Sequence, residues 1–146
     1  NYGCLTNNIT LSSLPHLNEQ ITIECRISSS VDILDEDRTQ LTISFPPYGF
    51  DITNFDCPDG GKRYSSPSQY SWKGEIIKYQ IYVLSVTFIV KSEGEGNIYA
   101  GIWAAEQDNV QNLTVDNSMI ALHIDKYNSW CKIMPHAPHG ELVPYP

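Results

Sequence analysis

Two β-prone runs separated by a glycine-rich turn occupy the middle of the sequence and constrain its fold most strongly. In residues 79–90 nearly every side chain is apolar or β-branched, and only three polar residues interrupt the run. Runs rich in Ile, Val, Tyr and Phe favour a pleated strand over a helix. Residues 92–97 (SEGEGN) supply glycine and asparagine, which tolerate a positive φ, and residues 98–105 form the second run. The pattern predicts a β-hairpin at the centre of an all-β core.

Shorter segments of the same character flank this hairpin. Residues 20–28 alternate strictly between aliphatic and polar side chains, which is typical of a strand with one buried and one solvated face. Residues 7–14, 40–45 and 118–127 also predict strands, whereas no segment predicts a helix. Together they favour a two-sheet antiparallel β-sandwich.

Two segments fall outside the strand pattern. Residues 50–74 contain two prolines and three glycines, and residues 57–74 of this segment predict a long loop. Residues 128–146 hold four of the nine prolines and show no periodicity. We therefore expect one domain over residues 1–127 and a Pro-rich tail or linker over residues 128–146.

The charge balance argues against nucleic-acid binding. Nine basic against seventeen acidic residues give a net charge of −8, and no basic run offsets it. Phosphate groups would be repelled over most of such a surface. The longest apolar stretch is too short to cross a bilayer, so no transmembrane segment is expected.

Cysteines and glycosylation signals point to an extracellular location. Cys4, Cys25, Cys57 and Cys131 are even in number and lack the close spacing of zinc ligands, so we expect two disulfides. Asn8 and Asn112 each begin an N-glycosylation sequon. Disulfides and sequons in an all-β chain are typical of secreted proteins and cell-surface ectodomains.

Several segments resemble an immunoglobulin domain of the variable or intermediate sets, as in invertebrate recognition receptors. NEQITIEC resembles the second strand, in which alternating aliphatics lead into a cysteine, and SMIALHID resembles the last strand. VTFIVKSEGEGNIYAG resembles the fifth strand, the turn and the sixth strand. The resemblance implies that Tyr99 forms the buried "tyrosine corner" of the family. A jelly roll or another sandwich shares the same strand pattern.

Two hallmarks of that family are missing. Gly101 stands where the second core cysteine belongs, and the third strand lacks the core tryptophan. Trp103 is expected to fill the vacant volume, since it shares the face of Tyr99. The immunoglobulin topology implies the pairs Cys4–Cys25 and Cys57–Cys131, unless Cys57 ends a returning strand and approaches Cys25 instead.

Aromatic residues give the candidate binding site. Tyr64, Tyr70 and Trp72 group beside Arg63 in the expected loop, and rigid aromatics beside cations are typical of protein interfaces and sugar sites. The alternative is that these rings cap an open end of the sandwich. The acidic residues of 32–37 could hold Ca²⁺, but the segment lacks the ligand spacing and turn glycine of a calcium loop, so a solvated loop is the favoured interpretation.

The predicted function is recognition or adhesion by an extracellular module that binds a protein partner or a second copy of itself. This module would belong to a larger receptor or secreted protein. The alternative is a carbohydrate-binding, lectin-like module, with or without Ca²⁺. No nucleophile or acid–base constellation is present in the sequence, so neither an enzyme nor a cofactor is expected.

Overall fold

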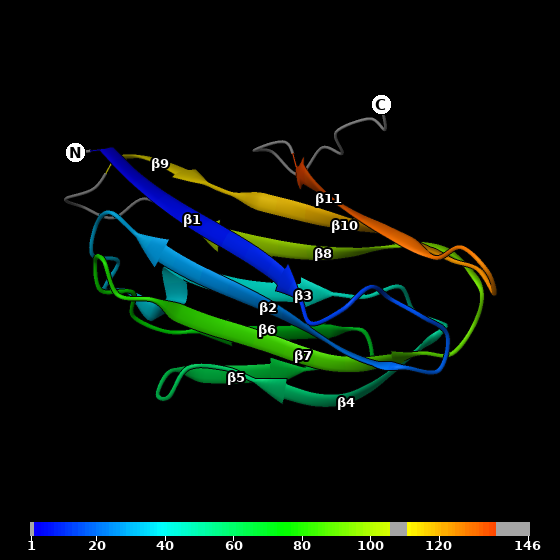
Figure 1. The fold of residues 1–146 in the computed structure, drawn as a ribbon. Coiled ribbons are helices and arrows are strands. Elements are labelled where there is room, and N and C mark those ends of the chain that lie inside the picture. Colours follow the sequence, from blue (N-terminus) through cyan, green and yellow to red (C-terminus); the bar gives the residue numbers. More distant parts are fainter. Residues whose placement is uncertain (1, 106–110, 137–146) are drawn as a thin grey trace.

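The computed structural model describes residues 2–105 and 111–136, which form two packed β-sheets (Figure 1). The strands are β1 (Tyr2–Leu11), β2 (Gln20–Ser29), β3 (Thr39–Ser44), β4 (Phe50–Asp56), β5 (Lys62–Ser65), β6 (Gln69–Lys73), β7 (Tyr82–Val90), β8 (Gly94–Ala104), β9 (Gln111–Val115), β10 (Asn117–Ile124) and β11 (Trp130–His136). One 3₁₀ turn, η1 (Glu36–Arg38), precedes β3. The predicted all-β sandwich is confirmed.

The order of the strands is immunoglobulin-like. One sheet has the order β4-β7-β2-β1-β9, and the other has the order β11-β10-β8-β3-β6-β5. All neighbouring strands are antiparallel except the parallel pair β1 and β9. In the immunoglobulin arrangement the first, second, fifth and fourth strands share a sheet, as β1, β2, β7 and β4 do here. The third, sixth and seventh strands correspond to β3, β8 and β10.

The core lies between the sheets and is built by alternation along each strand. In β2 the side chains of Ile21, Ile23 and Ile27 are buried, as the sequence pattern predicts. Phe45, at the end of β3, packs against Phe88 of β7 with ring centroids 5.1 Å apart. These contacts join the two sheets, and burying each such side chain stabilises the fold by roughly 1.5–3 kcal/mol.

Two expectations about loops and boundaries are wrong. Residues 57–74 are not one long loop, because β5 and β6 form a hairpin there that extends the β3 edge of its sheet. The folded domain also continues past residue 127, since β11 pairs with β10 from Trp130 to His136. β5 and β6 are short, and β11 is interrupted by lysine and proline, so the alternation of these three strands is hidden in the sequence. Residues 137–146 of the expected tail lie outside the described part of the chain.

The predicted role of Tyr99 is wrong, and another tyrosine takes it. Tyr99 faces the outer surface of its sheet, where it packs against a small apolar cluster on β10 and β11. The core tryptophan is Trp72, whose indole N–H donates to the carbonyl of Gly60 and whose ring lies 5.8 Å from that of Tyr82. The hydroxyl of Tyr82 accepts the backbone N–H of Ile77 at 2.8 Å. Tyr82 therefore makes the bond to upstream backbone expected of Tyr99.

The four cysteines are free thiols, and the predicted pairs do not form. Cys25 lies opposite Ile9, five residues along β1 from Cys4, so about 17 Å of strand separates the two cysteines. β4, which precedes Cys57, and β11, which carries Cys131, lie at opposite margins of the sandwich (Figure 1). The register places Cys57 two strands from Cys25, about 9.6 Å, beyond disulfide reach.

Candidate binding groove

An aromatic and polar surface covers the outer face of the six-stranded sheet. Trp103 of β8 is 54% exposed, and Tyr99 lies four residues before it on the same face. Gly101, between them, leaves a gap, because a Cβ at this position would meet only the Asn117 side chain, at 3.5 Å. The expectation that Trp103 fills the core is wrong, since it faces solvent.

A groove of about 980 Å³ opens beside these residues, between β8 and β9. Six consecutive residues of β8, Tyr99–Ala104, line one wall, and three consecutive residues of β9, Leu113–Val115, line another. Consecutive residues of a strand point their side chains to opposite faces. Because consecutive residues of each strand line the groove, side chains from both faces of the strand contribute to it. The groove therefore runs along the edges of β8 and β9. Gln40, Thr42, Gln69, Asn117 and Ser118 complete the lining.

The groove exists because one stretch of chain changes sheets. Only Asp116 separates β9 from β10, yet these strands belong to different sheets. The backbone N–H of Asp116 donates to the carbonyl of Leu5 in β1, whereas the side-chain oxygen of Asn117 accepts the N–H of Ile102 in β8. The ladder between β10 and β8 ends at the pair Ser118–Ala100, so within the described chain no strand pairs with the last residues of β8 on that side.

A hydrogen-bonded ladder of uncharged side chains fixes the adjoining surface. The Gln40 amide nitrogen donates to the hydroxyls of Thr42 (3.1 Å) and Ser71 (3.2 Å). These two hydroxyls are 2.9 Å apart and bond to each other. Because these bonds use only the amide nitrogen of Gln40, its amide oxygen stays available to a ligand. The side chains are preorganised, which lowers the entropy cost of binding.

The groove is electrostatically neutral on an acidic protein. None of the described residues that line it is charged, although the chain carries a net charge of −8. A mostly apolar concave site with a few fixed polar groups is the usual form of a binding site. The arrangement suits an uncharged ligand that combines apolar contact with hydrogen bonding.

The predicted aromatic site is divided between two faces. Trp72 and Tyr70 lie in the core, where burial raises the pKa of the Tyr70 hydroxyl. Arg63 reaches across to the other sheet, where its guanidinium bonds to the carbonyl of Phe55 (2.6 Å) and lies over that ring. Only Tyr64 is on the outer face. It is 49% exposed and lines a smaller cavity that shares Gln40 and Gln69 with the groove.

The carboxylates of the acidic segment 32–37 interact with separate partners. Asp35 accepts the N–H of Asp37 at the start of η1. Asp32 accepts the N–H of Lys78, and Glu36 lies 3.5 Å from Lys62, whose pKa it raises. Among the residues the structure describes, no three metal-ligating side chains gather to hold an ion.

The two sequon asparagines lie on neighbouring strands of one sheet. Asn8 is exposed on β1, so a glycan could be accommodated there. Asn112 lies in β9, but its side chain is outside the described part of the structure. The described residues also contain no helix long and apolar enough to span a membrane.

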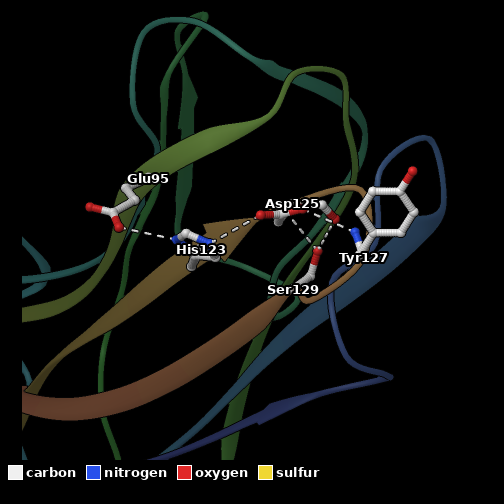
Figure 2. A network of polar contacts seen from close by, with 5 residues as sticks. All are labelled: Glu95, His123, Asp125, Tyr127 and Ser129. Atoms are coloured by element: carbon white, nitrogen blue, oxygen red, sulfur yellow. Dashed lines mark hydrogen bonds and ion pairs between the residues drawn. The ribbon is translucent and has the colours of Figure 1, made fainter.

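A second polar cluster lies at the other end of β8 and β10 (Figure 2). The imidazole of His123 lies 3.0 Å from Glu95 and 3.8 Å from Asp125, and its ring stacks on Trp130. Asp125 also accepts the N–H of Tyr127, which closes the turn between β10 and β11. The Ser129 hydroxyl accepts the backbone N–H of Asp125 (3.0 Å) and donates to the Asp125 carbonyl (2.9 Å), so it is bonded to the backbone of the turn and not to the imidazole. We assign the cluster a structural role in this turn.

Sequence reasoning missed Gln40, Asn117 and the outward direction of Trp103. In β8 both faces look apolar, because Ile98, Ala100 and Ile102 alternate with aromatic residues and glycine. A shift of one residue exchanges the two faces of a strand, and the alternation alone could not decide between them. The more polar outward positions of β3, opposite β8, carried the only usable signal.

Comparison with known proteins assigns the chain to no family. No family model matches the sequence, and no curated protein matches it. Among solved structures, the chain is similar to a cohesin module from a family 33 glycoside hydrolase of Clostridium perfringens. That similarity has a TM-score of 0.45 and 10% sequence identity, and it covers 90% of this chain and 93% of the module.

Proposed function

We propose that this domain is an extracellular, non-catalytic recognition module that binds a protein partner through the groove between β8 and β9. The observation that carries the proposal is the exposed Trp103 beside an uncharged groove on an otherwise acidic protein. Exposed tryptophan is enriched where protein interfaces concentrate their binding energy. Membership of the immunoglobulin superfamily is part of the proposal and is supported by the strand order.

The extracellular location is supported by the sequons and the acidic surface. Asn8 is exposed, as a glycosylated asparagine must be. The free thiols give this location no support. The non-catalytic part of the proposal is supported by the uncharged lining, because general acid–base or nucleophilic chemistry requires ionisable groups beside the substrate.

A neutral carbohydrate is the second candidate ligand. Sugars stack on exposed aromatic rings and bond to amides and hydroxyls, and Trp103 lies near Gln40 and Asn117 in the same lining. The fixed amide and hydroxyl ladder is the observation that favours this candidate. The part of the lining that the structure describes carries no charge, so it offers a charged glycan no ionic partner.

Parallel screening separates the two candidates. The domain is applied to an array of extracellular proteins and to a glycan array, with Trp103→Ala and Trp130→Ala as matched variants. Trp130 is 40% exposed on the outer part of the same sheet but does not line the groove. The proposal expects protein binding that Trp103→Ala removes and Trp130→Ala retains. Binding only to neutral glycans, or binding that ignores Trp103, contradicts it.

A further inference from the structure

The unpaired end of β8 exposes backbone hydrogen-bonding groups to the groove. Ala105 donates its N–H to the carbonyl of Arg38, on the side of β3. Backbone groups of successive strand residues point to opposite sides, so Gly101 and Trp103 also face β3. Ile102 and Ala104 face the opposite side, where no strand of the described chain pairs with them.

One of these groups already has a substitute partner. The N–H of Ile102 donates to Asn117 Oδ1 at 2.5 Å, in the place where a neighbouring strand would present a carbonyl. The carbonyl of Ile102 and the N–H of Ala104 lie further along the same edge, and no strand of the described chain offers them a ladder partner. Backbone groups need a partner when they are buried, so a ligand that covers this edge has to supply one.

The other wall of the groove is also a strand edge. β9 is the last strand of its sheet and pairs only with β1. The groove therefore separates two strand edges that belong to different sheets. One extended chain placed between them would pair with the open edge of β8, and β9 would flank it on its other side.

From this geometry we infer that the groove binds an extended, uncharged segment of the partner protein as an added β-strand. The inference rests on the proposed function and specifies its partner. Main-chain hydrogen bonds to Ile102 and Ala104 supply affinity, and the pockets around Trp103 select side chains. The open edge of residues 101–104 accommodates about four residues at roughly 3.4 Å each.

Charge determines which segments fit. Among the described residues the lining offers no cation to an acidic side chain, and the net charge of −8 repels one. A buried lysine or arginine would also lack a charged partner in the lining, and unpaired buried charge is strongly unfavourable. A segment of alternating apolar and small polar residues meets both conditions.

The probe is a phage-displayed library of random 12-residue peptides, selected on the wild-type domain and counter-screened on Trp103→Ala. Each selected peptide is synthesised with single N-methyl groups along its length, and the dissociation constants are compared. Strand addition predicts a period of two: methylation weakens binding about tenfold at alternate positions and has little effect at those between. These tolerated positions are the internal control.

A variant of the domain itself tests the hydrogen bond that the Ala104 N–H would donate to the peptide. Ala104→Pro removes the free N–H without removing a bond to β3, and proline is tolerated at a strand edge that faces solvent. Binding should weaken about tenfold, while thermal unfolding verifies that the variant is folded.

The outcomes distinguish a failure of strand addition from a failure of the proposed function. Peptides that depend on Trp103 but show no alternation, and that tolerate Ala104→Pro, overturn strand addition and leave the proposed function standing. A library that yields no Trp103-dependent peptide overturns strand addition, and the proposed function falls only if the protein array also shows no Trp103-dependent binding.

Discussion

Asn117 Oδ1 accepts the backbone N–H of Ile102 at 2.5 Å, and this bond lies where β10 stops pairing with β8. The side-chain oxygen of Asn117 takes the place of a backbone carbonyl that a continued ladder between β10 and β8 would supply. It ties the end of β8 to the start of β10, while β9, which ends at Val115, belongs to the other sheet. The groove forms where the chain passes from one sheet to the other between β9 and β10.

Removing the Asn117 acceptor should destabilise the end of β8. Asn117→Ala leaves the Ile102 N–H without its partner, so we expect a loss of about 1 kcal/mol in the free energy of unfolding. Amide hydrogen exchange should accelerate at Ile102 and stay slow at Trp103, which faces β3. Asn117→Asp retains an acceptor oxygen and should restore protection. Unchanged exchange at Ile102 in Asn117→Ala would contradict the assignment.

Tyr82, and not Tyr99, should carry the stabilising tyrosine hydroxyl. Tyr82→Phe removes the acceptor of the Ile77 N–H and should lower the free energy of unfolding by about 1 kcal/mol in urea denaturation. Tyr48→Phe is the control, since its side chain is largely exposed. Equal effects of the two substitutions would show that the Tyr82 bond contributes nothing.

Cys25 should make the stability depend on alkaline pH. Burial raises the pKa of its thiol to about 12, from an ordinary value of 9.0. Between these values the unfolded chain loses the proton and the folded chain keeps it, so stability falls as the pH rises. The fall should approach 1.4 kcal/mol per pH unit, and Cys25→Ala should remove it. Burial raises the pKa of Cys57 and Cys131 too, so the comparison with Cys25→Ala isolates one thiol. Parallel pH curves for the two proteins would refute this.

The thiols should also differ in reactivity. Cys4 is exposed, whereas Cys25 is buried in the core. Alkylation by iodoacetamide requires an accessible thiolate, so native protein should be modified first at Cys4 and at Cys25 only on unfolding. Peptide mapping by mass spectrometry measures the order. Recovery of a peptide that joins Cys4 to Cys25 would contradict both the register and the free thiols.

The sequence was sufficient to predict the sandwich because alternation and β-propensity are local properties. The Ile21, Ile23 and Ile27 stripe of β2 had only one reasonable buried face, and the structure buries it. β8 differed because both its faces are apolar, so the choice depended on neighbouring strands. The groove was not predictable from the sequence. It arises because Asp116 bonds to one sheet and Asn117 to the other, and this depends on tertiary structure.

The aromatic site failed for a related reason. Residues 62–73 look like a loop because strands of four and five residues carry too few alternations to identify. Once paired, these strands direct Trp72 inward and Tyr64 outward, so sequence neighbours separate onto two faces. Proximity along the chain was therefore a poor guide to which rings share a surface.

The most direct test of the groove is to fill it from within. Gly101 lies between Tyr99 and Trp103 on the outer face and has space for a side chain, so Gly101→Leu should leave the free energy of unfolding within about 0.5 kcal/mol of wild type. Calorimetric titration with a Trp103-dependent peptide should then show no binding. Undiminished affinity in a folded Gly101→Leu domain would contradict the claim that this groove is the recognition site.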